Sequence, residues 1–269
     1  MIITIRKILL LSLVLFSSGI WAGETYYFFN PESNVDSYAS LKSEFENYFS
    51  QRGGFNFQPF DLGDNLEKVL NSKTSGAYLL SGGLYGQYRS KGDLDPHLVG
   101  ISKGSVVQRK ILCIKGSGGL EDLKGQTVAS SGSPQYVRGF LREVFGPDKS
   151  AILDSIRILS VPKDIDALMA VNFGMANASL TSESSLQKLS LINPAQTSAL
   201  KTLGQSGESF LLVASLPRQA DRSTVEMMGV LERMSLDPDG IKDLKMIGLD
   251  GWKRIDTLPP SAQKLLRTP

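Results

Sequence analysis

Short β-forming segments alternate with amphipathic helical segments along the chain, and this alternation restricts the fold more than any other feature. The first unit has apolar segments at residues 25–29, 55–60 and 77–80, which are separated by two stretches of helical periodicity. A second unit repeats this order over residues 127–180. Such alternation favours open sheets with helices on both faces. We therefore predict an α/β protein whose sheets are mixed, mostly parallel and flanked by helices.

The beginning of the chain has the three parts of a secretory signal peptide. Arg6 and Lys7 precede an apolar run over residues 8–16, and the small residue Ala22 suits signal peptidase. The run is too short to anchor the chain in a bilayer, and no cysteine stands near Ala22 to accept a lipid. A buried N-terminal helix is the alternative, but it would place both cations at the positive end of the helix dipole. We expect residues 1–22 to be removed and a soluble protein to be released into the periplasm.

The charge balance argues against a nucleic-acid partner. Removing Arg6 and Lys7 from the 29 basic residues leaves 27, which equals the 27 acidic residues. A nucleic-acid-binding surface normally carries a basic stripe that neutralises phosphates, and the sequence contains no such cluster. Beyond the leader, no apolar segment is long enough to predict a membrane span.

The sequence offers few residues for catalysis or metal binding. It contains one cysteine, Cys113, and one histidine, His97, whereas a structural zinc site needs about four ligands. Cys113 lies in the apolar, strand-like segment 110–114, where burial raises the pKa of a thiol and makes it less reactive. His97 follows Asp95 and Pro96 in an expected surface turn. We expect no disulfide, metal or cofactor, and a cysteine-dependent hydrolase or transferase remains only as an alternative.

Residues 120–133, LEDLKGQTVASSGS, resemble the substrate-binding proteins of ABC importers, in the phosphate and phosphonate-type branch of the type II periplasmic binding protein fold. The same proteins are also resembled by four further segments of the chain, residues 30–33, 77–82, 209–217 and 237–252. The resemblance implies two α/β lobes with a ligand cleft between them. After the expected signal peptide at 1–22, it places lobe one at 23–108 and 213–269, and lobe two at 109–212. It also implies that the protein delivers its ligand to the membrane subunits of an importer, and we expect a monomer without a cofactor.

A serine-rich loop between a predicted strand and a predicted helix is the strongest candidate for ligand binding. The loop consists of Ser130, Ser131, Gly132 and Ser133. Ser133 suits the N-cap of the helix, and Pro134 suits its first turn. A helix start of this kind presents free N–H groups and the positive end of the helix dipole, which favour an anion. Solvated serines with a purely capping Ser133 are the alternative.

Further candidates lie where other predicted strands end, because open α/β sheets bind ligands beyond the carboxyl ends of their strands. On lobe one they are Asn30, Glu32, Ser33, Ser81, Gly82 and Tyr85, and on lobe two they are Asn177 and Ser179, to which Tyr136 is added from the start of the predicted helix. The two tyrosines offer an aromatic face and a hydroxyl to a ligand, although partly buried packing would also explain them. Glu32 would repel a plain anion unless it is protonated or binds an amine. We therefore expect a small polar ligand that is anionic or zwitterionic, and phosphate-like or phosphonate-like ligands are included.

The same fold serves more than one role in the cell. An exported binding protein delivers its ligand to an ABC importer or acts as the ligand-sensing partner of a membrane receptor or kinase. Because function belongs to the site and the partner, the fold does not separate these two roles.

Overall fold

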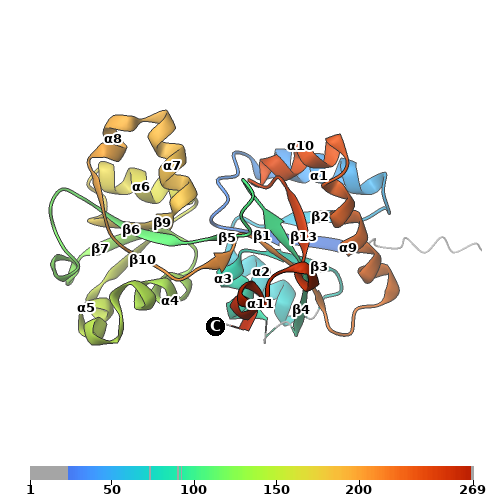
Figure 1. The fold of residues 1–269 in the computed structure, drawn as a ribbon, viewed down its shortest axis with the longest axis horizontal. Coiled ribbons are helices and arrows are strands. Elements are labelled where there is room, and N and C mark those ends of the chain that lie inside the picture. The colour runs from blue at the N-terminus through green and yellow to red at the C-terminus, as the bar shows by residue number, and fades with distance from the viewer. Residues whose placement is uncertain (1–23, 73, 90, 92, 268–269) are drawn as a thin grey trace, which may run out of the picture.

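The computed structural model describes residues 24–72, 74–89, 91 and 93–267, and it consists of two lobes side by side (Figure 1). The predicted signal peptide, residues 1–22, lies outside the described residues. The larger lobe is built on a six-stranded sheet with the order β13-β4-β12-β3-β1-β2. Its strands are β1 (Thr25–Phe29), β2 (Asn56–Pro59), β3 (Ala77–Leu80), β4 (Leu94–Ile101), β12 (Val213–Pro217) and β13 (Gly251–Arg254). Its helices are α1 (Tyr38–Ser50), α2 (Gly63–Asn71), α3 (Gly82–Tyr88), α9 (Arg222–Met234), α10 (Pro238–Met246) and α11 (Pro260–Gln263).

The smaller lobe is built on a five-stranded sheet with the order β10-β6-β9-β7-β8. Its strands are β6 (Lys110–Lys115), β7 (Thr127–Ser131), β8 (Arg157–Val161), β9 (Ala178–Ser182) and β10 (Leu200–Gln205). Its helices are α4 (Pro134–Phe145), α5 (Ser150–Ser155), α6 (Asp164–Asn172), α7 (Glu183–Ile192) and α8 (Pro194–Ser198). Short 3₁₀ turns complete both lobes.

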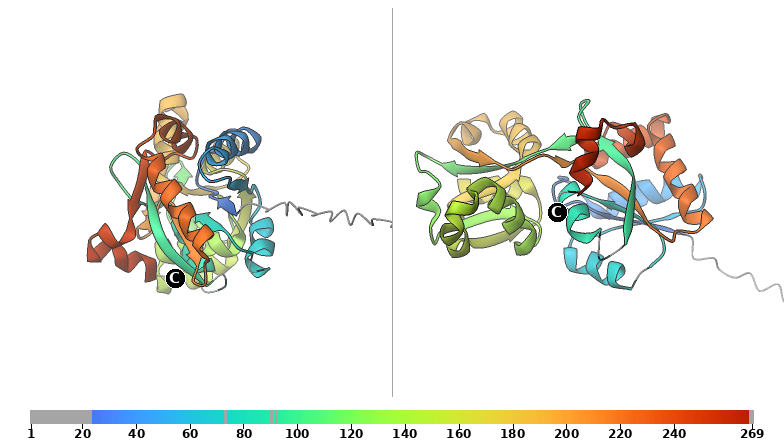
Figure 2. Two further views of the ribbon diagram at one scale, coloured as in Figure 1. Left: turned by 90° about the vertical axis from the view of Figure 1, so that its right-hand side faces the viewer. Right: turned by 60° about the horizontal axis from the view of Figure 1, so that its bottom comes forward.

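Two short strands carry the chain between the lobes. β5 (Val107–Gln108) pairs antiparallel with β11 (Ser209–Phe210), and the connections run side by side between the lobes (Figure 2). The predicted two-lobed α/β architecture is therefore present. The limits proposed for lobe two, residues 109 and 212, stay predictions.

The core of the larger lobe follows from the period-two pattern of β1. Tyr26 and Phe28 belong to one apolar cluster and Tyr27 to the other, so both faces of this strand are buried. On the first face, α1 covers the sheet, and the ring of Tyr26 stacks on Phe49 with centroids 4.1 Å apart. The helical spacing of apolar residues that predicted α1 therefore places them on the sheet, as amphipathic packing requires.

The sheets are mixed, as predicted, but parallel pairing does not predominate. Among the described residues, two of five pairings in the larger sheet and two of four in the smaller one are parallel. The predicted turn around His97 is wrong, because Asp95, Pro96 and His97 belong to β4. Pro96 lies opposite a register shift in β12, where a strand tolerates a residue that has no N–H.

A second difference concerns the residues directly after β3, which were predicted only as the end of a strand and form α3. A Cβ at Gly82 would lie 2.4 Å from the carbonyl oxygen of Phe210, so glycine is needed there for the close approach of β11. Gly83 is similarly close to the rings of Phe140 and Tyr136. Contacts between distant segments therefore hold a helix that local propensity disfavours.

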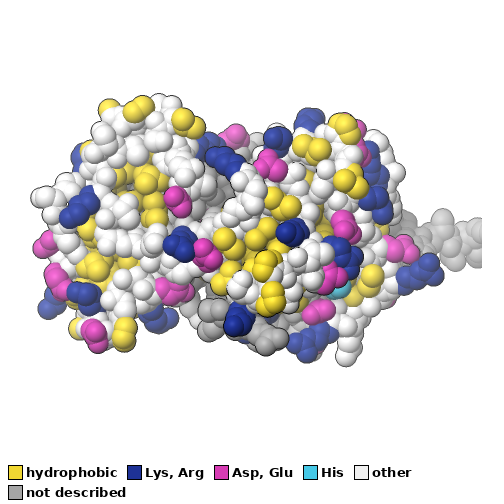
Figure 3. Space-filling view, viewed as in Figure 1, with side chains coloured by type: hydrophobic (Ala, Val, Ile, Leu, Met, Phe, Trp, Pro, Cys, Tyr) yellow, Lys and Arg dark blue, Asp and Glu magenta, His cyan; other side chains and the backbone are white. Residues whose placement is uncertain are grey.

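The surface of the face shown in Figure 3 carries cations and anions interspersed over both lobes, with no extended region of one sign. No helix among the described residues is long and apolar enough to cross a membrane.

Candidate functional site

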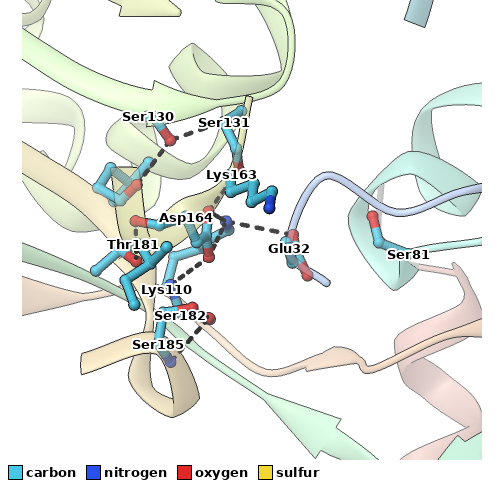
Figure 4. Close-up of polar contacts among 12 residues, drawn as sticks. Glu32, Ser81, Lys110, Ser130, Ser131, Lys163, Asp164, Thr181, Ser182 and Ser185 are labelled. Carbon is cyan, nitrogen blue, oxygen red and sulfur yellow. Dashed lines mark hydrogen bonds and ion pairs between the residues drawn. The ribbon is translucent and has the colours of Figure 1, made fainter. Parts of the chain in front are cut away.

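The candidate site lies between the lobes, where strand ends of the two sheets meet. From the larger lobe come the loop after β1, with Glu32, and Ser81 after β3. From the smaller lobe come the ends of β7 and β9 and the start of α6. β6 runs antiparallel to β9 with Lys110 opposite Ser182, so the start of β6 lies at the same edge. Figure 4 draws the polar side chains that gather there.

Asp164, the first residue of α6, is the best-connected group of the site. Its side chain is fully buried, and Lys110 Nζ lies 2.9 and 3.0 Å from its two oxygens. The Ser131 hydroxyl donates to Oδ1, and the backbone N–H of Ser182 donates to Oδ2 at 2.6 Å. We call these four residues, Lys110, Ser131, Asp164 and Ser182, the Asp164 cluster. A buried carboxylate with this many donors is held in one orientation.

Glu32 connects the larger lobe to this cluster. Its Oε1 lies 3.5 Å from Lys110 Nζ, and both side chains are only 2% exposed. The Tyr136 hydroxyl donates to the same oxygen, and Gln108 Nε2 donates to the other. The Ser81 hydroxyl of the larger lobe lies 3.3 Å from the Tyr136 hydroxyl. Acidic, basic and hydroxyl groups of the two lobes therefore meet in one buried network.

A second contact between the lobes lies beside this network. Asn34 Nδ2 donates to Ser185 Oγ at 3.0 Å, and Asn34 Oδ1 accepts the backbone N–H of Ile165 at 3.2 Å. Ser185 in turn lies 2.8 Å from Ser182 Oγ. The loop after β1 thus reaches the starts of both α6 and α7.

The charges of the site do not balance among Glu32, Lys110 and Asp164, since two carboxylates face one ammonium group. Burial raises the pKa of Glu32, and the Asp164 carboxylate adds to this rise against the opposing effect of Lys110. Burial alone would lower the pKa of Lys110, but the Asp164 and Glu32 carboxylates together raise it above its ordinary value. Lys110 therefore stays protonated and pairs with Asp164 first, because that contact is shorter and bidentate.

The serine-rich loop positions Tyr136. Ser133 is exposed and its hydroxyl accepts the N–H of Tyr136 at 3.3 Å, which confirms the predicted N-cap of α4. Gly132 has a φ of +91°, and a Cβ there would lie 2.6 Å from the Tyr136 ring. Burial and the Glu32 carboxylate raise the pKa of the Tyr136 hydroxyl, so it stays protonated and donates. The loop thus holds a hydrogen-bond donor over Glu32.

Other predicted residues shape the loops around the site. Asn30 Oδ1 accepts the N–H of Glu32 at 3.0 Å, and the Ser33 hydroxyl donates to the Asn30 carbonyl at 2.7 Å. The Ser130 hydroxyl donates to the carbonyl of Leu180 at 2.7 Å and so joins β7 to β9. A ligand-binding role for these residues, and for Gly82, stays a prediction.

Three predicted residues lie away from the network. Asn177 is exposed at the start of β9, where its Oδ1 accepts the N–H of Thr127 at 3.2 Å. It therefore lies at the opposite end of the strands from Ser131, and its placement at a carboxyl strand end is wrong. Ser179 is buried inside β9, three residues before the end of the strand at Ser182. Tyr85 belongs neither to the Asp164 cluster nor to the contacts of Glu32, but it lines a cavity together with Gly82 and Tyr136, and burial raises the pKa of its hydroxyl.

Three members of the Asp164 cluster were not predicted from the sequence. Lys110 was considered only as the start of an apolar strand, and Asp164 and Ser182 were not considered. Asp164 and Ser182 each follow or end a strand that runs parallel to β7, so the rule applied to the other loops would have found them. Lys110 gave no such signal, because it lies at the amino end of its strand.

The structure gives no support to a cysteine-dependent site. Cys113 is buried in β6, its Sγ lies 3.7 Å from the Thr202 hydroxyl, and burial raises the pKa of its thiol. His97 belongs to β4, in the other sheet. Among the residues described, no group of three or more His, Cys, Asp or Glu side chains is placed to hold a metal ion.

The fold is similar to solved binding proteins over most of its length. XAC2383 from Xanthomonas citri, solved bound to ATP, matches with a TM-score of 0.70 and 12% identity over 91% of this chain and 94% of that one. A binding protein component of an ABC phosphonate transporter from Pseudomonas aeruginosa matches with a TM-score of 0.67 and 13% identity, over 86% and 80% of the two chains. PhnD1 from Prochlorococcus marinus, in complex with methylphosphonate, matches with a TM-score of 0.64 and 12% identity, over 91% and 97%.

At these identities the likeness concerns the fold. The chain has the two-lobed periplasmic binding protein fold that the resemblance of residues 120–133 implied. No protein-family model and no curated protein matches the sequence.

Proposed function

We propose that this protein is a solute-binding protein of the periplasm that captures a small polar ligand between its lobes for an ABC importer. The observation that carries the proposal is the buried contact of Glu32, from the larger lobe, with Tyr136 and Lys110 of the smaller one. Polar groups from both lobes meet where α/β sheets bind ligands. A ligand that contacts both lobes stabilises their closed arrangement, which is the signal a membrane partner reads.

The charges favour a ligand that bears an amine, either cationic or zwitterionic. Because the Lys110 ammonium pairs more closely with Asp164 than with Glu32, the Glu32 carboxylate is the uncompensated negative charge of the buried network. A ligand ammonium would balance this charge, which a buried carboxylate otherwise carries at a cost in free energy. The Lys163 side chain extends from the start of α6 towards the Glu32 loop in Figure 4. It would receive the acidic end of a zwitterion. This narrows the ligand class expected from the sequence, in which plain anions were included.

The test is a thermal-shift screen of amines, amino acids, aminophosphonates and plain oxyanions, followed by calorimetric titration of the best ligand. Glu32→Gln should weaken binding of an amine-bearing ligand by about tenfold or more, since a hydrogen bond to a charged group contributes about 1.5–3 kcal/mol. Glu67→Gln is the matched control, because Glu67 also accepts a tyrosine hydroxyl, from Tyr88 at 2.7 Å, within the larger lobe. Equal affinities of the parent and Glu32→Gln would contradict the proposed ligand class.

Export and delivery are tested separately. Mass analysis of the secreted protein should give a chain that begins near Gly23, and retention of residues 1–22 would contradict export through a cleaved signal peptide. Co-purification with importer membrane subunits, or with a receptor kinase, then decides between the importer role and the sensory role.

A further inference from the structure

The carboxylate of Asp164 accepts hydrogen bonds from an ammonium group, a side-chain hydroxyl and a backbone N–H. Oδ1 accepts from Ser131 and Lys110, and Oδ2 accepts from Lys110 and from the N–H of Ser182 at 2.6 Å. A hydroxyl, a backbone N–H and an ammonium group that converge on two oxygens form a binding place for an oxyanion. In this chain the Asp164 carboxylate of the protein itself occupies that place.

The Ser130 hydroxyl, next to Ser131 in the chain, is also used within the protein. The Ser130 hydroxyl donates to the carbonyl of Leu180 at 2.7 Å, and exposed Ser133 accepts the N–H of Tyr136 as the N-cap of α4. Two hydroxyl donors of the serine-rich loop that predicted an anion site, those of Ser130 and Ser131, are therefore already bound within the protein.

We propose that Asp164 is a specificity-determining residue, which excludes oxyanion groups of ligands from the Lys110, Ser131 and Ser182 donors by occupying them with its own carboxylate. This inference rests on the proposed function, because it concerns selection among ligands in the same cleft. An incoming phosphate, phosphonate or carboxylate group would have to displace Asp164. It would also lie beside the Glu32 carboxylate, in a buried setting where like charges repel strongly.

Removing the carboxylate should convert the cluster into an anion site. Asp164→Ala leaves Lys110, Ser131 and the Ser182 N–H unpaired around the vacated volume, and buried donors without partners favour any anion that fits. Asp164→Asn keeps the volume filled but removes the negative charge. The two variants therefore separate the loss of repulsion from the creation of a cavity.

The experiment compares thermal shifts of the parent and of both variants with formate, phosphate and methylphosphonate, against chloride at equal ionic strength. We expect the melting temperature of Asp164→Ala to rise by about 3–6 °C for each tenfold excess of formate or phosphate over its dissociation constant. The parent should respond as it does to chloride. Asp243→Ala is the matched control, because Asp243 is also a buried aspartate, on α10 of the other lobe.

Two further outcomes decide whether Asp164 selects among ligands or only stabilises the fold. A carboxylate that only supports the fold would be replaced by formate in Asp164→Ala, but Asp164→Asn would gain nothing. Selectivity predicts that Asp164→Asn binds phosphate or methylphosphonate at least about tenfold more tightly than the parent, and that adding Lys110→Met abolishes this gain. If Asp164→Ala does not fold, the test is the comparison of oxyanion affinity between Asp164→Asn and the parent.

The inference is overturned if the parent binds these oxyanions as tightly as Asp164→Asn, or if neither variant gains affinity for them. Binding of amine-bearing solutes by the parent is measured in parallel. Retained amine binding without a gain in the variants contradicts only the role of Asp164, whereas a gain without any amine binding contradicts only the proposed ligand class.

Discussion

Removal of the Lys110 ammonium is the most direct test of the buried network. Lys110→Met keeps a long, flexible side chain but leaves two carboxylates, Glu32 and Asp164, without a cation. Both partners of the contact are at most 2% exposed, and loss of one partner of a buried ion pair typically costs about 3–5 kcal/mol. Because a whole domain is stable by only about 5–15 kcal/mol, this loss is large. We expect the free energy of unfolding to fall by that amount at neutral pH.

Equilibrium unfolding in urea measures this change from the shift in midpoint at constant slope. Lys242→Met is the matched control: the Lys242 ammonium also lies 2.9 Å from a carboxylate oxygen, that of Glu44, but on the surface, so its removal should change stability far less. A double variant, Lys110→Met with Asp164→Asn, should recover part of the loss, since one uncompensated charge is then removed as well.

The sign of the pH dependence gives a second check. Burial already raises the pKa of Glu32, and removing Lys110 raises it further because the attraction that opposed this rise is gone. A carboxyl group with a raised pKa in the folded state destabilises that state once it ionises, so stability returns as the pH falls through the raised pKa. Lys110→Met should therefore approach the parent in stability as the pH falls through the raised pKa of Glu32. A loss below about 1 kcal/mol at neutral pH, or a loss independent of pH, would refute this account of the network.

Three further predictions concern other parts of the chain. Gly132→Ala should lower the free energy of unfolding in urea by about 1–3 kcal/mol, because the φ of +91° at Gly132 and the adjacent tyrosine ring disfavour a side chain. Gly139→Ala is the control and should not destabilise the protein, because Gly139 in α4 has open space around it. Burial and the nearby Glu44 carboxylate raise the pKa of Asp243 from 3.8 to about 6, so the parent loses stability as the pH rises from 3.8 to about 6. The melting temperature of Asp243→Asn should therefore be higher than that of the parent at neutral pH, with no difference at or below pH 3.8. The Cys113 thiol should react slowly with a labelling reagent in native buffer, and rapid reaction would contradict its burial.

Local sequence patterns determined much of the fold. The apolar spacing that predicted α1 places Phe45 and Phe49 in the core, and the Ser133-Pro134 pair begins α4 as expected. These features depend on residues close together in the chain, and so they can be recognised without knowledge of the partner strands. The same is true of Cys113, whose apolar neighbours predicted its burial.

The candidate site was only partly predictable, because residues far apart in the sequence form it. Glu32 and Tyr136 are 104 residues apart, and Lys110 and Asp164 are 54 residues apart. The rule that ligands bind beyond the carboxyl ends of strands indicated Glu32 and Ser81, and the structure places both in contact with Tyr136 of the other lobe. It failed for Asn177, since the strand begins there instead of ending.

Strand direction explains what only the tertiary structure decided. β6 runs antiparallel to β9, so Lys110 reaches the site from the amino end of its strand, opposite Ser182. The sequence shows where an apolar strand begins and ends, but hydrogen bonding to a distant neighbour fixes its direction in the sheet. That direction brings the Lys110 ammonium to Asp164, and with it the buried charges on which the proposed selectivity rests.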